Sequence, residues 1–411
     1  MEIGNGRHLT YCTNIHAGET WNDIFPQLKK FLPEIKRQLS PNSPFGIGLR
    51  LSNRMSEDLL DRVTFDEFTS WLSEQDLYVF TMNGFPYGGF HRQVVKDSVH
   101  HPDWTTIHRL QYTKRLFNLL ANLLPDGIDG GISTSPLSYK PWYDGDKKKY
   151  EAALDSSTRN ILRIVQHLAG IHRTTGKLLH LDLEPEPDGL LECTGDVIDY
   201  FENRLLPTAA KFLPAALGVT PKESNRLIKE YIRVCYDICH LSVAYEKPKE
   251  AIARLKKYGI KIGKIQITAA LQATLPKSPL KRKPILAELE RFAEPVYLHQ
   301  AVTCDQKNKL TRYSDLDYAL KDISSSNAQE LRTHFHVPIY KENFGKLEST
   351  QAELIETLSV LNRNPFSNHL EVETYTWELL PESERTDLIG SITRELEWVI
   401  KQMKDTKRRH A

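Results

Sequence analysis

Long apolar runs and paired cysteines are both missing from this sequence of 411 residues. No stretch approaches the roughly 18 apolar residues of a membrane span, and the first residues, MEIGNGRHLTYCTN, contain no apolar signal core. The five cysteines form an odd set without the repeated spacing of a zinc ribbon or a disulfide framework. Reduced thiols are the simpler interpretation, so we expect a cytoplasmic protein without a membrane span.

An excess of charge of one sign is missing too. The chain has 54 lysines and arginines against 53 aspartates and glutamates, which gives a formal net charge of +1. This balance argues against a surface dedicated to nucleic acid, so no nucleic-acid partner is expected. No GxGxxG motif follows any predicted strand, which disfavours a dinucleotide-binding fold. Hydrophobic residues make up 40% of the chain, enough for a sizeable core without disulfides.

Short apolar segments alternate with long amphipathic ones along the whole chain. The segments predicted as strands of one sheet are His8–Ile15, Phe45–Leu51, Leu77–Met82, Gly131–Thr134, Leu178–Leu183, Ile232–Tyr236, Lys264–Thr268 and His369–Tyr375. The predicted helices are Thr20–Gln38, Ser56–Gln75, Trp104–Leu124, Lys147–Arg173, Asp196–Leu213, Pro221–Glu230, Lys249–Tyr258, Glu348–Leu361 and Ser383–Lys404. This alternation predicts an α/β protein with a parallel sheet. Eight units fit a closed (β/α)8 TIM barrel, with an open doubly wound sheet as the alternative.

Residues 271–346 do not follow the alternation. We expect them to form an insertion after the seventh strand, on the rim of a single barrel domain that spans residues 1–411. The first part, Leu271–Lys283, contains LPKSPLKRKP and is expected to be irregular, and two strand-like segments follow at Val296–Val302 and Arg332–Tyr340. Active sites of such barrels lie at the carboxyl ends of the strands, so polar residues there carry the functional argument.

The predicted strand Ile232–Tyr236 is followed by Asp237 and, three residues later, by His240. A carboxylate and an imidazole on one rim are both metal ligands. The alternative is an aspartate that only begins the next helix, with a partly exposed histidine beside it. Other predicted strands also end in carboxylate, imidazole or amide groups, which favours the metal site.

Two further strands carry carboxylates in alternation. In LLHLDLEPEPDG, the period of two places His180, Asp182 and Glu184 on one face. Glu184 lies nearest the rim and is assigned to a metal, whereas His180 and Asp182 are expected to pair deeper in the barrel. In LEVETYTW, Glu371 and Glu373 repeat the arrangement, with a structural inner group and a functional outer one. Three ionisable groups facing a barrel interior are costly to bury unless they are paired or bind a cation.

The remaining candidates come from the seventh strand and the insertion. Gln266 points into the barrel if its isoleucine neighbours point out. The insertion contributes His299 and the pair His334 and His336, whose imidazoles share one face of an extended segment. A single such pair is more often two ordinary histidines. The joint occurrence of all these groups at the strand ends favours a divalent metal site.

These residues resemble the xylose isomerase-like barrel superfamily, which contains sugar isomerases, epimerases and endonuclease IV. YDICH resembles a stretch of the endonuclease IV branch, LDLEPEP the rim-glutamate strand of the sugar epimerases, and EVETY their final strand. NIHAGETW, FGIGLRLS, YVFTMNGFPYGGFH and LDLEPEPDG together resemble the EboE-type metabolite traffic proteins of bacterial gene clusters. The first resemblance is confined to the strand ends, and the second covers nearly the whole chain.

The resemblance implies roles for individual residues. The metal ligands would be Glu184, Asp237, Gln266, His336 and Glu373. Gln266 stands where the superfamily usually has a histidine, and His334 where endonuclease IV has an aspartate. These departures disfavour a three-zinc cluster and imply one divalent ion (Zn, Mn or Mg), or two. The residues assigned to substrate binding are His16, Arg50, Asn83, His240, His299 and His334.

Three functions fit these assignments. The first is a metal-dependent isomerase or epimerase that acts on a small polyhydroxylated or prenylated metabolite, with Glu184 and Glu373 as the catalytic carboxylates. The second is metal-dependent hydrolysis of a phosphoester. The third is a non-catalytic barrel that binds a metabolite. The expected partners are a small-molecule substrate and other products of its gene cluster.

Overall fold

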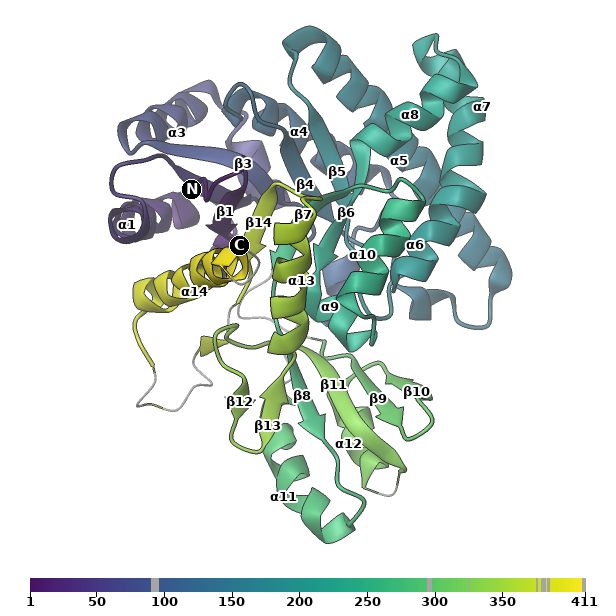
Figure 1. The fold of residues 1–411 in the computed structure, drawn as a ribbon. Helices are drawn as coiled ribbons and strands as arrows, with labels where there is room; N and C mark the ends of the chain where they lie inside the picture. Colours follow the sequence, from purple (N-terminus) through teal and green to yellow (C-terminus); the bar gives the residue numbers. More distant parts are fainter. Residues whose placement is uncertain are drawn as a thin grey trace.

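The computed structural model of the chain describes residues 1–89, 96–293, 298–324, 326–374, 376–377, 382 and 385–408. Three of the residues in predicted strands, Val296, Tyr297 and Tyr375, lie outside these ranges, as does the predicted helix start Ser383. Two sheets organise the chain, one in the upper and one in the lower part of Figure 1.

The larger sheet is an eight-stranded parallel barrel, which confirms the predicted (β/α)8 fold. Its strands follow one another around the barrel in the order β1-β14-β7-β6-β5-β4-β3-β2, and a parallel bridge between Cys12 and Gly48 joins the two ends. Their bounds are β1 (His8–Tyr11), β2 (Phe45–Arg50), β3 (Leu77–Asn83), β4 (Gly130–Thr134), β5 (Leu179–Leu183), β6 (Ile232–Asp237), β7 (Ile262–Ile267) and β14 (His369–Val372). The first strand ends earlier than predicted, because Thr13–Ile15 form a 3-10 turn.

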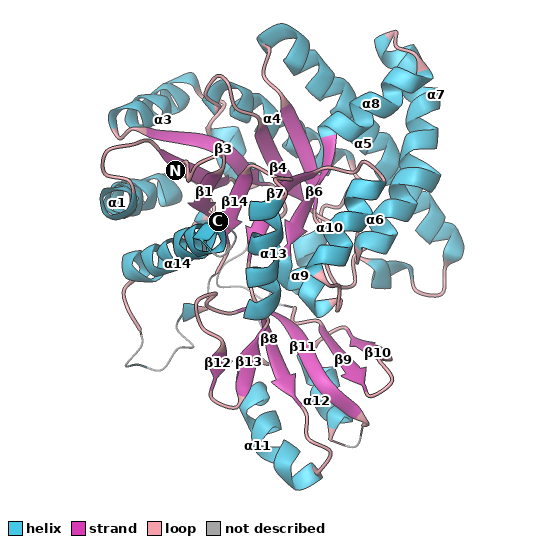
Figure 2. Cartoon of the chain, in the orientation of Figure 1, coloured by secondary structure: helices cyan, strands magenta, loops and turns pink. Residues whose placement is uncertain are grey.

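Helices cover the outside of the barrel (Figure 2). They are α1 (Trp21–Leu39), α2 (Asn53–Asp58), α3 (Arg62–Glu74), α4 (Ile107–Leu123), α5 (Lys147–Thr175), α6 (Thr194–Tyr200), α7 (Leu206–Leu217), α8 (Pro221–Tyr231), α9 (Ile238–Val243), α10 (Pro248–Lys257), α13 (Gln351–Arg363) and α14 (Leu388–Arg408). Capping residues set several helix starts. Thr20 and Asp23 form a capping box at α1, and Thr220 and Glu223 form another at α8.

The smaller sheet, called the inserted sheet below, is formed by residues 270–349 between β7 and α13, a range slightly longer than the predicted 271–346, and it is antiparallel at each of its pairings. It has the order β10-β9-β11-β8-β13-β12. Its elements are β8 (Ala270–Thr274), α11 (Pro279–Leu289), β9 (Ala301–Asp305), β10 (Leu310–Tyr313), α12 (Leu316–Ile323), β11 (Ala328–His336), β12 (Asn343–Phe344) and β13 (Leu347–Ser349).

The prediction that Leu271–Lys283 is irregular is wrong, because this segment contains β8 and the start of α11. Its prolines do not prevent this outcome. Pro279 is the first residue of α11, where a proline costs no hydrogen bond. The two strands predicted in the insertion are real but displaced. β9 begins near the end of the first prediction, and β11 begins four residues before Arg332.

The barrel interior contains charged pairs. His180 Nδ1 lies 2.6 Å from Asp182 Oδ1, as the sequence predicted, and Lys264 Nζ lies 2.5 Å from Glu371 Oε2. Glycines on other strands of the barrel make room for these groups. A Cβ added at Gly263 would lie 1.9 Å from Asp182 Oδ1. Asp182 and Glu371, the carboxylates deeper in the barrel, therefore have a structural role.

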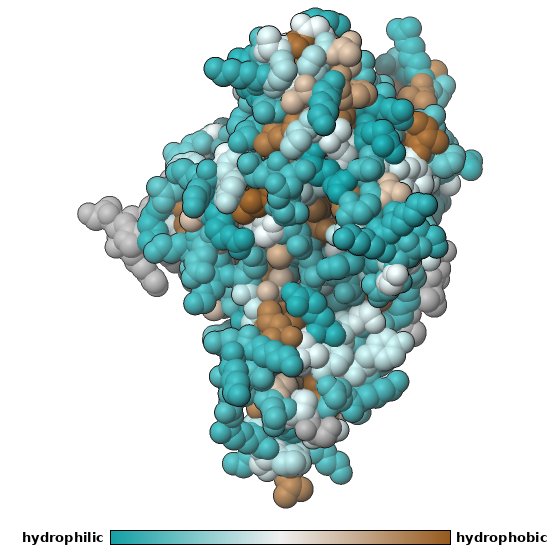
Figure 3. Space-filling view, turned by 90° about the vertical axis from the view of Figure 1, so that its right-hand side faces the viewer, coloured by the Kyte–Doolittle hydropathy of each residue, from teal (hydrophilic) through white to brown (hydrophobic). Residues whose placement is uncertain are grey.

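The surface is mixed in character. The face shown in Figure 3 is mostly hydrophilic, with hydrophobic side chains in small separate groups. Within the described ranges, every helix is too short or too polar to span a membrane.

Candidate metal centre

Three carboxylates from three strands meet at the carboxyl end of the barrel. Glu184 follows β5, Asp237 is the last residue of β6, and Glu373 follows β14. One oxygen of each lies within 4.8 Å of the others, although the residues are up to 189 positions apart in the sequence. All three side chains are buried. The parallel barrel brings them together, because the carboxyl ends of its strands share one rim.

The electrostatics of this cluster favour a cation. Burial, and after it the neighbouring Asp237 carboxylate, raise the pKa of Glu184 well above its usual range. Burial also raises the pKa of Glu373. Neither Glu184 Oε2 nor Asp237 Oδ2 has a hydrogen-bond partner among the described residues. Buried carboxylates of this kind are costly unless protons or a positive ion neutralise them, so the donor set fits a divalent metal.

Three amide side chains hold Glu373 in place. Asn14 Nδ2 donates to Glu373 Oε1 over 2.5 Å, Asn83 Nδ2 donates to the same oxygen over 3.1 Å, and Gln266 Nε2 donates to Oε2. The amide oxygen of Gln266 accepts a hydrogen bond from the Cys235 thiol at 3.0 Å. Gln266 therefore contacts the cluster through its nitrogen, whereas the sequence predicted an oxygen ligand.

Asp237 begins α9 and faces the cluster at the same time. Its Oδ1 accepts hydrogen bonds from the His240 backbone N–H at 3.1 Å and from Thr268 Oγ1 at 2.7 Å. The helix-capping role, which the sequence left as the alternative, and the position in the cluster thus use different oxygens of one carboxylate. Oδ2 is the oxygen available to an ion.

A group of histidines lies beside the carboxylates. His240 Nδ1 lies 3.0 Å from the carbonyl oxygen of Pro185, and His334 Nδ1 lies 2.8 Å from Gln300 Oε1. Both partners are acceptors, so each Nδ1 carries a proton and each Nε2 presents a lone pair. These two Nε2 atoms are only 3.0 Å apart. Burial lowers the pKa of His240 to about 4 and that of His334 well below its usual range, so a proton does not readily bridge the pair.

A second possible ion position follows from this geometry. Glu186, His240 and His334 each offer a ligand atom within 4.8 Å of the other two, and so do Asp237, His240 and His336. His336 Nδ1 lies 2.9 Å from the carbonyl oxygen of Glu373, which orients the ring. His334 and His336 come from β11, so the inserted sheet completes the rim of the barrel.

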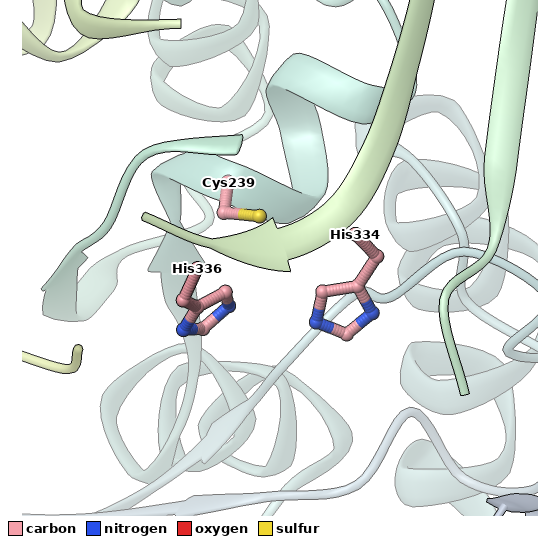
Figure 4. Close-up of side chains that lie close together, drawn as sticks. All are labelled: Cys239, His334 and His336. Atoms are coloured by element: carbon pink, nitrogen blue, oxygen red, sulfur yellow. The ribbon is translucent and has the colours of Figure 1, made fainter. Parts of the chain in front are cut away.

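Cys239 belongs to another such group with His334 and His336. In Figure 4, both imidazoles project to one side of the β11 ribbon, and Cys239 lies on the other side. Burial raises the pKa of the Cys239 thiol well above its usual range, which opposes the thiolate that a metal requires. We therefore leave Cys239 out of the metal centre.

A cavity of about 80 Å³ opens beside the cluster. Its described polar wall consists of Asn14, Asn83, Lys96, Glu184, Glu186, His240, His334, His336 and Glu373. Its described apolar wall consists of Phe85, Pro86, Val99 and Leu298. A ligand here would meet both metal-binding groups and hydrocarbon.

Three of the residues predicted to bind substrate lie elsewhere. Arg50 donates to the carbonyl oxygens of Gly88 and Gly18, at 2.8 and 3.4 Å, and so ties two rim loops together. His16 Nε2 lies 2.8 Å from Tyr11 Oη. The His299 ring stacks on Phe335 with a centroid separation of 4.9 Å. The described lining of the cavity includes none of the three.

The sequence assignment did not include Asn14, Glu186 or Lys96, which also line the cavity. The sequence could have indicated Glu186, because LEPEP places a second glutamate two residues after Glu184. Burial raises the pKa of Glu186 to about 8, and its Oε1 lies 3.6 Å from His334 Nδ1. Asn14 ends the first predicted segment, but nothing local indicates that its amide reaches a glutamate 359 residues away.

No family model and no curated protein matches this chain. Solved structures do match. One is described as a xylose isomerase-like TIM barrel protein from Mycobacterium smegmatis in complex with magnesium, at 11% identity and a TM-score of 0.52, covering 99% of each chain. Another is a D-tagatose 3-epimerase-like protein, at 10% identity and a TM-score of 0.52, covering 98% of this chain and 100% of the other. The chain therefore has the fold of the xylose isomerase-like TIM barrels.

Proposed function

We propose that this protein is a metal-dependent isomerase or epimerase of a small polyhydroxylated or prenylated metabolite. The observation that carries the proposal is the meeting of Glu184, Asp237 and Glu373, with two carboxylate oxygens that have no hydrogen-bond partner among the described residues. The xylose isomerase-like fold is consistent with a sugar-type substrate, and the magnesium complex of one structural neighbour is consistent with a divalent ion.

Glu184, Asp237 and Glu373 would hold the ion, with His336 beside them. A bound divalent ion at this position would polarise a substrate carbonyl and make the adjacent C–H more acidic. Glu184, which emerges from β5, would remove the proton from that carbon. Glu373, which emerges from β14 and whose pKa burial raises, would start in its protonated form and give that proton to the other face, after which exchange with solvent would restore both carboxyl groups. The hydrogen bonds from Asn14 and Asn83 fix the direction of the Glu373 carboxylate, which positions it for this transfer.

The resemblance to EboE-type metabolite traffic proteins adds a cellular compartment and partner proteins to this proposal. Under it, the protein works in the cytoplasm with other products of its gene cluster. The five free cysteines are compatible with a reducing compartment. The apolar wall formed by Phe85, Val99 and Leu298 would suit a prenyl or ring-bearing portion of the substrate.

A second function, phosphoester hydrolysis, is favoured by one observation. The facing lone pairs of His240 and His334, with Glu186 beside them, offer a position for a second ion. Two ions some 3.5–4 Å apart are typical of phosphoester hydrolases. Hydrolysis would then use both positions, whereas isomerisation needs only the carboxylate cluster.

Metal analysis combined with two activity assays tests these functions. We expect the wild-type protein to bind a divalent ion at the rim, and Glu184→Gln with Asp237→Asn to lose it. Deuterium exchange from solvent into candidate ketoses and sugar phosphates would support isomerisation, and phosphate release from esters would support hydrolysis. Rim metal without either activity would leave a metabolite-binding barrel. A wild-type rim that takes up no ion would refute the metal-dependent proposals.

A further inference from the structure

A second group of potential metal ligands lies at the opposite, amino-terminal end of the barrel. His180 is the second residue of β5, His369 is the first residue of β14, and Asp129 directly precedes β4. Both histidines are buried, and the Asp129 side chain is 23% exposed. The sequence assigned His180 only to a structural pair with Asp182. The rim site uses none of these residues.

The ligand atoms of this group lie close enough together to share one ion. Asp129 Oδ1 lies 3.3 Å from His369 Nε2, and Asp129 Oδ2 lies 3.6 Å from His180 Nε2. Each residue offers an atom within 4.8 Å of the other two. Two ligands bound to zinc at roughly 2.0–2.1 Å in tetrahedral directions are about 3.3 Å apart. The 3.6 Å contact is also longer than an ordinary hydrogen bond.

The hydrogen bonding of His180 prepares its outer nitrogen for a metal. Asp182 Oδ1 lies 2.6 Å from His180 Nδ1, so this nitrogen donates a proton to Asp182, and Nε2 is the nitrogen that faces Asp129. His180 Nε2 has no hydrogen-bond partner among the described residues, and its lone pair would be the one that binds a metal. A carboxylate that orients a histidine in this way is a regular feature of zinc sites. Without a proton or a cation, the lone pair would face the Asp129 carboxylate and be repelled by it.

The other two residues are held in place as well. His369 Nε2 lies 3.2 Å from the Asp129 carbonyl oxygen and 3.3 Å from Asp129 Oδ1. Zinc would replace the proton that this nitrogen donates to them, since a metal binds the deprotonated nitrogen. Arg233 Nη1 donates to Asp129 Oδ2 over 2.8 Å, which orients the carboxylate and leaves Oδ1 for an ion.

Solvent reaches the Asp129 side of this group. A cavity of about 520 Å³ opens at this end of the barrel, and Asp129 and Arg233 line it together with residues 259–263 and 364–368. Two imidazoles and one carboxylate form a ligand set that zinc prefers, with a fourth position left for water.

We propose that Asp129, His180 and His369 form a zinc site at the amino-terminal end of the barrel, separate from the rim cluster. Zinc there would join β5 and β14 to the segment that leads into β4. β4 and β5 are paired neighbours, whereas β14 lies three strands from β5, so the ion would tie β14 to them across the barrel interior. Zinc binding at this site does not depend on any catalytic activity of the rim cluster.

Zinc stoichiometry and thermal unfolding of the full chain test the proposal. The protein is stripped with chelator, dialysed and titrated with zinc. A rim variant with Glu184→Gln, Asp237→Asn and His334→Gln removes the carboxylate cluster and the second ion position formed by Glu186, His240 and His334. In this background we expect one equivalent of zinc to remain, and zinc to raise the melting temperature by several degrees. Adding His369→Gln should abolish both effects, and Asp129→Asn serves the same purpose if that variant does not fold.

His8→Gln is the matched control. His8 lies at the same end of the barrel, but its Nδ1 is 2.6 Å from Tyr78 Oη and it is not part of the ligand group. Zinc binding should survive this change. If the rim variant binds no zinc, or if both His369→Gln and Asp129→Asn retain it, the group is only a hydrogen-bond network and the proposal is wrong. Zinc that depends on His369 and not on Glu184 would support this site while refuting the metal at the rim.

Discussion

Single residues inside the barrel carry charge where many such barrels carry branched aliphatic side chains. Lys264 and Glu371 are both fully buried and form an ion pair. Burial alone would lower the pKa of Lys264, but Glu371 raises it above its usual value, so the ammonium form persists. An ion pair in this position is sensitive to the loss of one partner, because the other charge would remain in a medium of low dielectric constant.

Lys264→Met should lower the free energy of unfolding by about 3–5 kcal/mol, because it leaves Glu371 buried without its partner. The double variant Lys264→Met with Glu371→Gln removes both charges and should regain at least half of the loss. Urea denaturation followed by circular dichroism measures both values. Equal destabilisation in the single and double variants would show that the charge of Glu371 is not the cause.

Glu395 gives stability a dependence on pH. It lies on α14, is fully buried, and its Oε1 accepts the backbone N–H of Ile339 at 3.0 Å. Burial raises its pKa from 4.5 to about 8. The folded protein therefore holds this proton more tightly than the unfolded chain. The stabilisation of the folded protein by this proton is complete below about pH 4.5 and is lost as the pH rises through about 8.

Glu395→Gln should remove this part of the pH dependence, because the amide does not titrate. Between pH 5.5 and 7.5, the unfolding free energy of the wild-type protein should fall more steeply than that of the variant. The difference in slope should approach, and not exceed, about 1.4 kcal/mol per pH unit. Denaturant titrations at both pH values measure it. Parallel pH profiles would contradict the raised pKa.

At the scale of elements, glycines in the strands decide what the barrel can hold. Gly263 on β7 lies against the His180–Asp182 pair, and an added Cβ would be 2.7 Å from His180 Nδ1. Gly48 on β2 has the same relation to Glu371, whose Oε1 would be 1.9 Å from a Cβ. In each case the glycine has no side chain, so a strand two places away around the barrel can place a long polar side chain in the interior.

Gly263→Ala should destabilise the protein by roughly 1–3 kcal/mol, because the new methyl group overpacks a full interior and displaces Asp182. Gly170→Ala on α5 is the matched control, since a Cβ there meets nothing within 4 Å. That change should stabilise the protein by about 0.5–1 kcal/mol, because alanine favours a helix interior over glycine. Urea denaturation compares the two. A neutral Gly263→Ala would show that the pair can move aside.

At the scale of the whole molecule, the inserted sheet and the barrel share the rim site. Arg332 on β11 joins the two parts. Its Nη1 donates to the Ser242 carbonyl oxygen over 2.9 Å, and its Nη2 lies 2.8 Å from the Glu353 carboxylate. The guanidinium also lies over the Tyr245 ring, 4.5 Å from its centroid. Since β11 also carries His334 and His336, this contact helps to place the histidines over the carboxylates.

Arg332→Met should cost about 3 kcal/mol of stability, because it removes a largely buried charge and leaves Glu353 without its partner. It should also speed hydrogen exchange in β11 and weaken any metal bound at the rim. Arg37→Met is the control. Arg37 pairs with Glu34, and the two side chains are 69% and 34% exposed, so its loss should change the free energy of unfolding far less than the loss of Arg332. Equal effects of the two variants would contradict the tie through Arg332.

Residue alternation and strand–helix order, which are local properties, predicted the barrel, the inward face of Glu184 and the pairing of His180 with Asp182. They did not predict the pairings of the inserted sheet, because hydrogen bonds between distant strands leave no local pattern in the chain. The amide contacts of Asn14 and Gln266 with Glu373 are also set by the barrel, which brings β1, β7 and β14 side by side. The sequence by itself thus determined which side chains face inward. The tertiary structure decided which of them touch, because the closure of the sheet chooses the neighbours of each group.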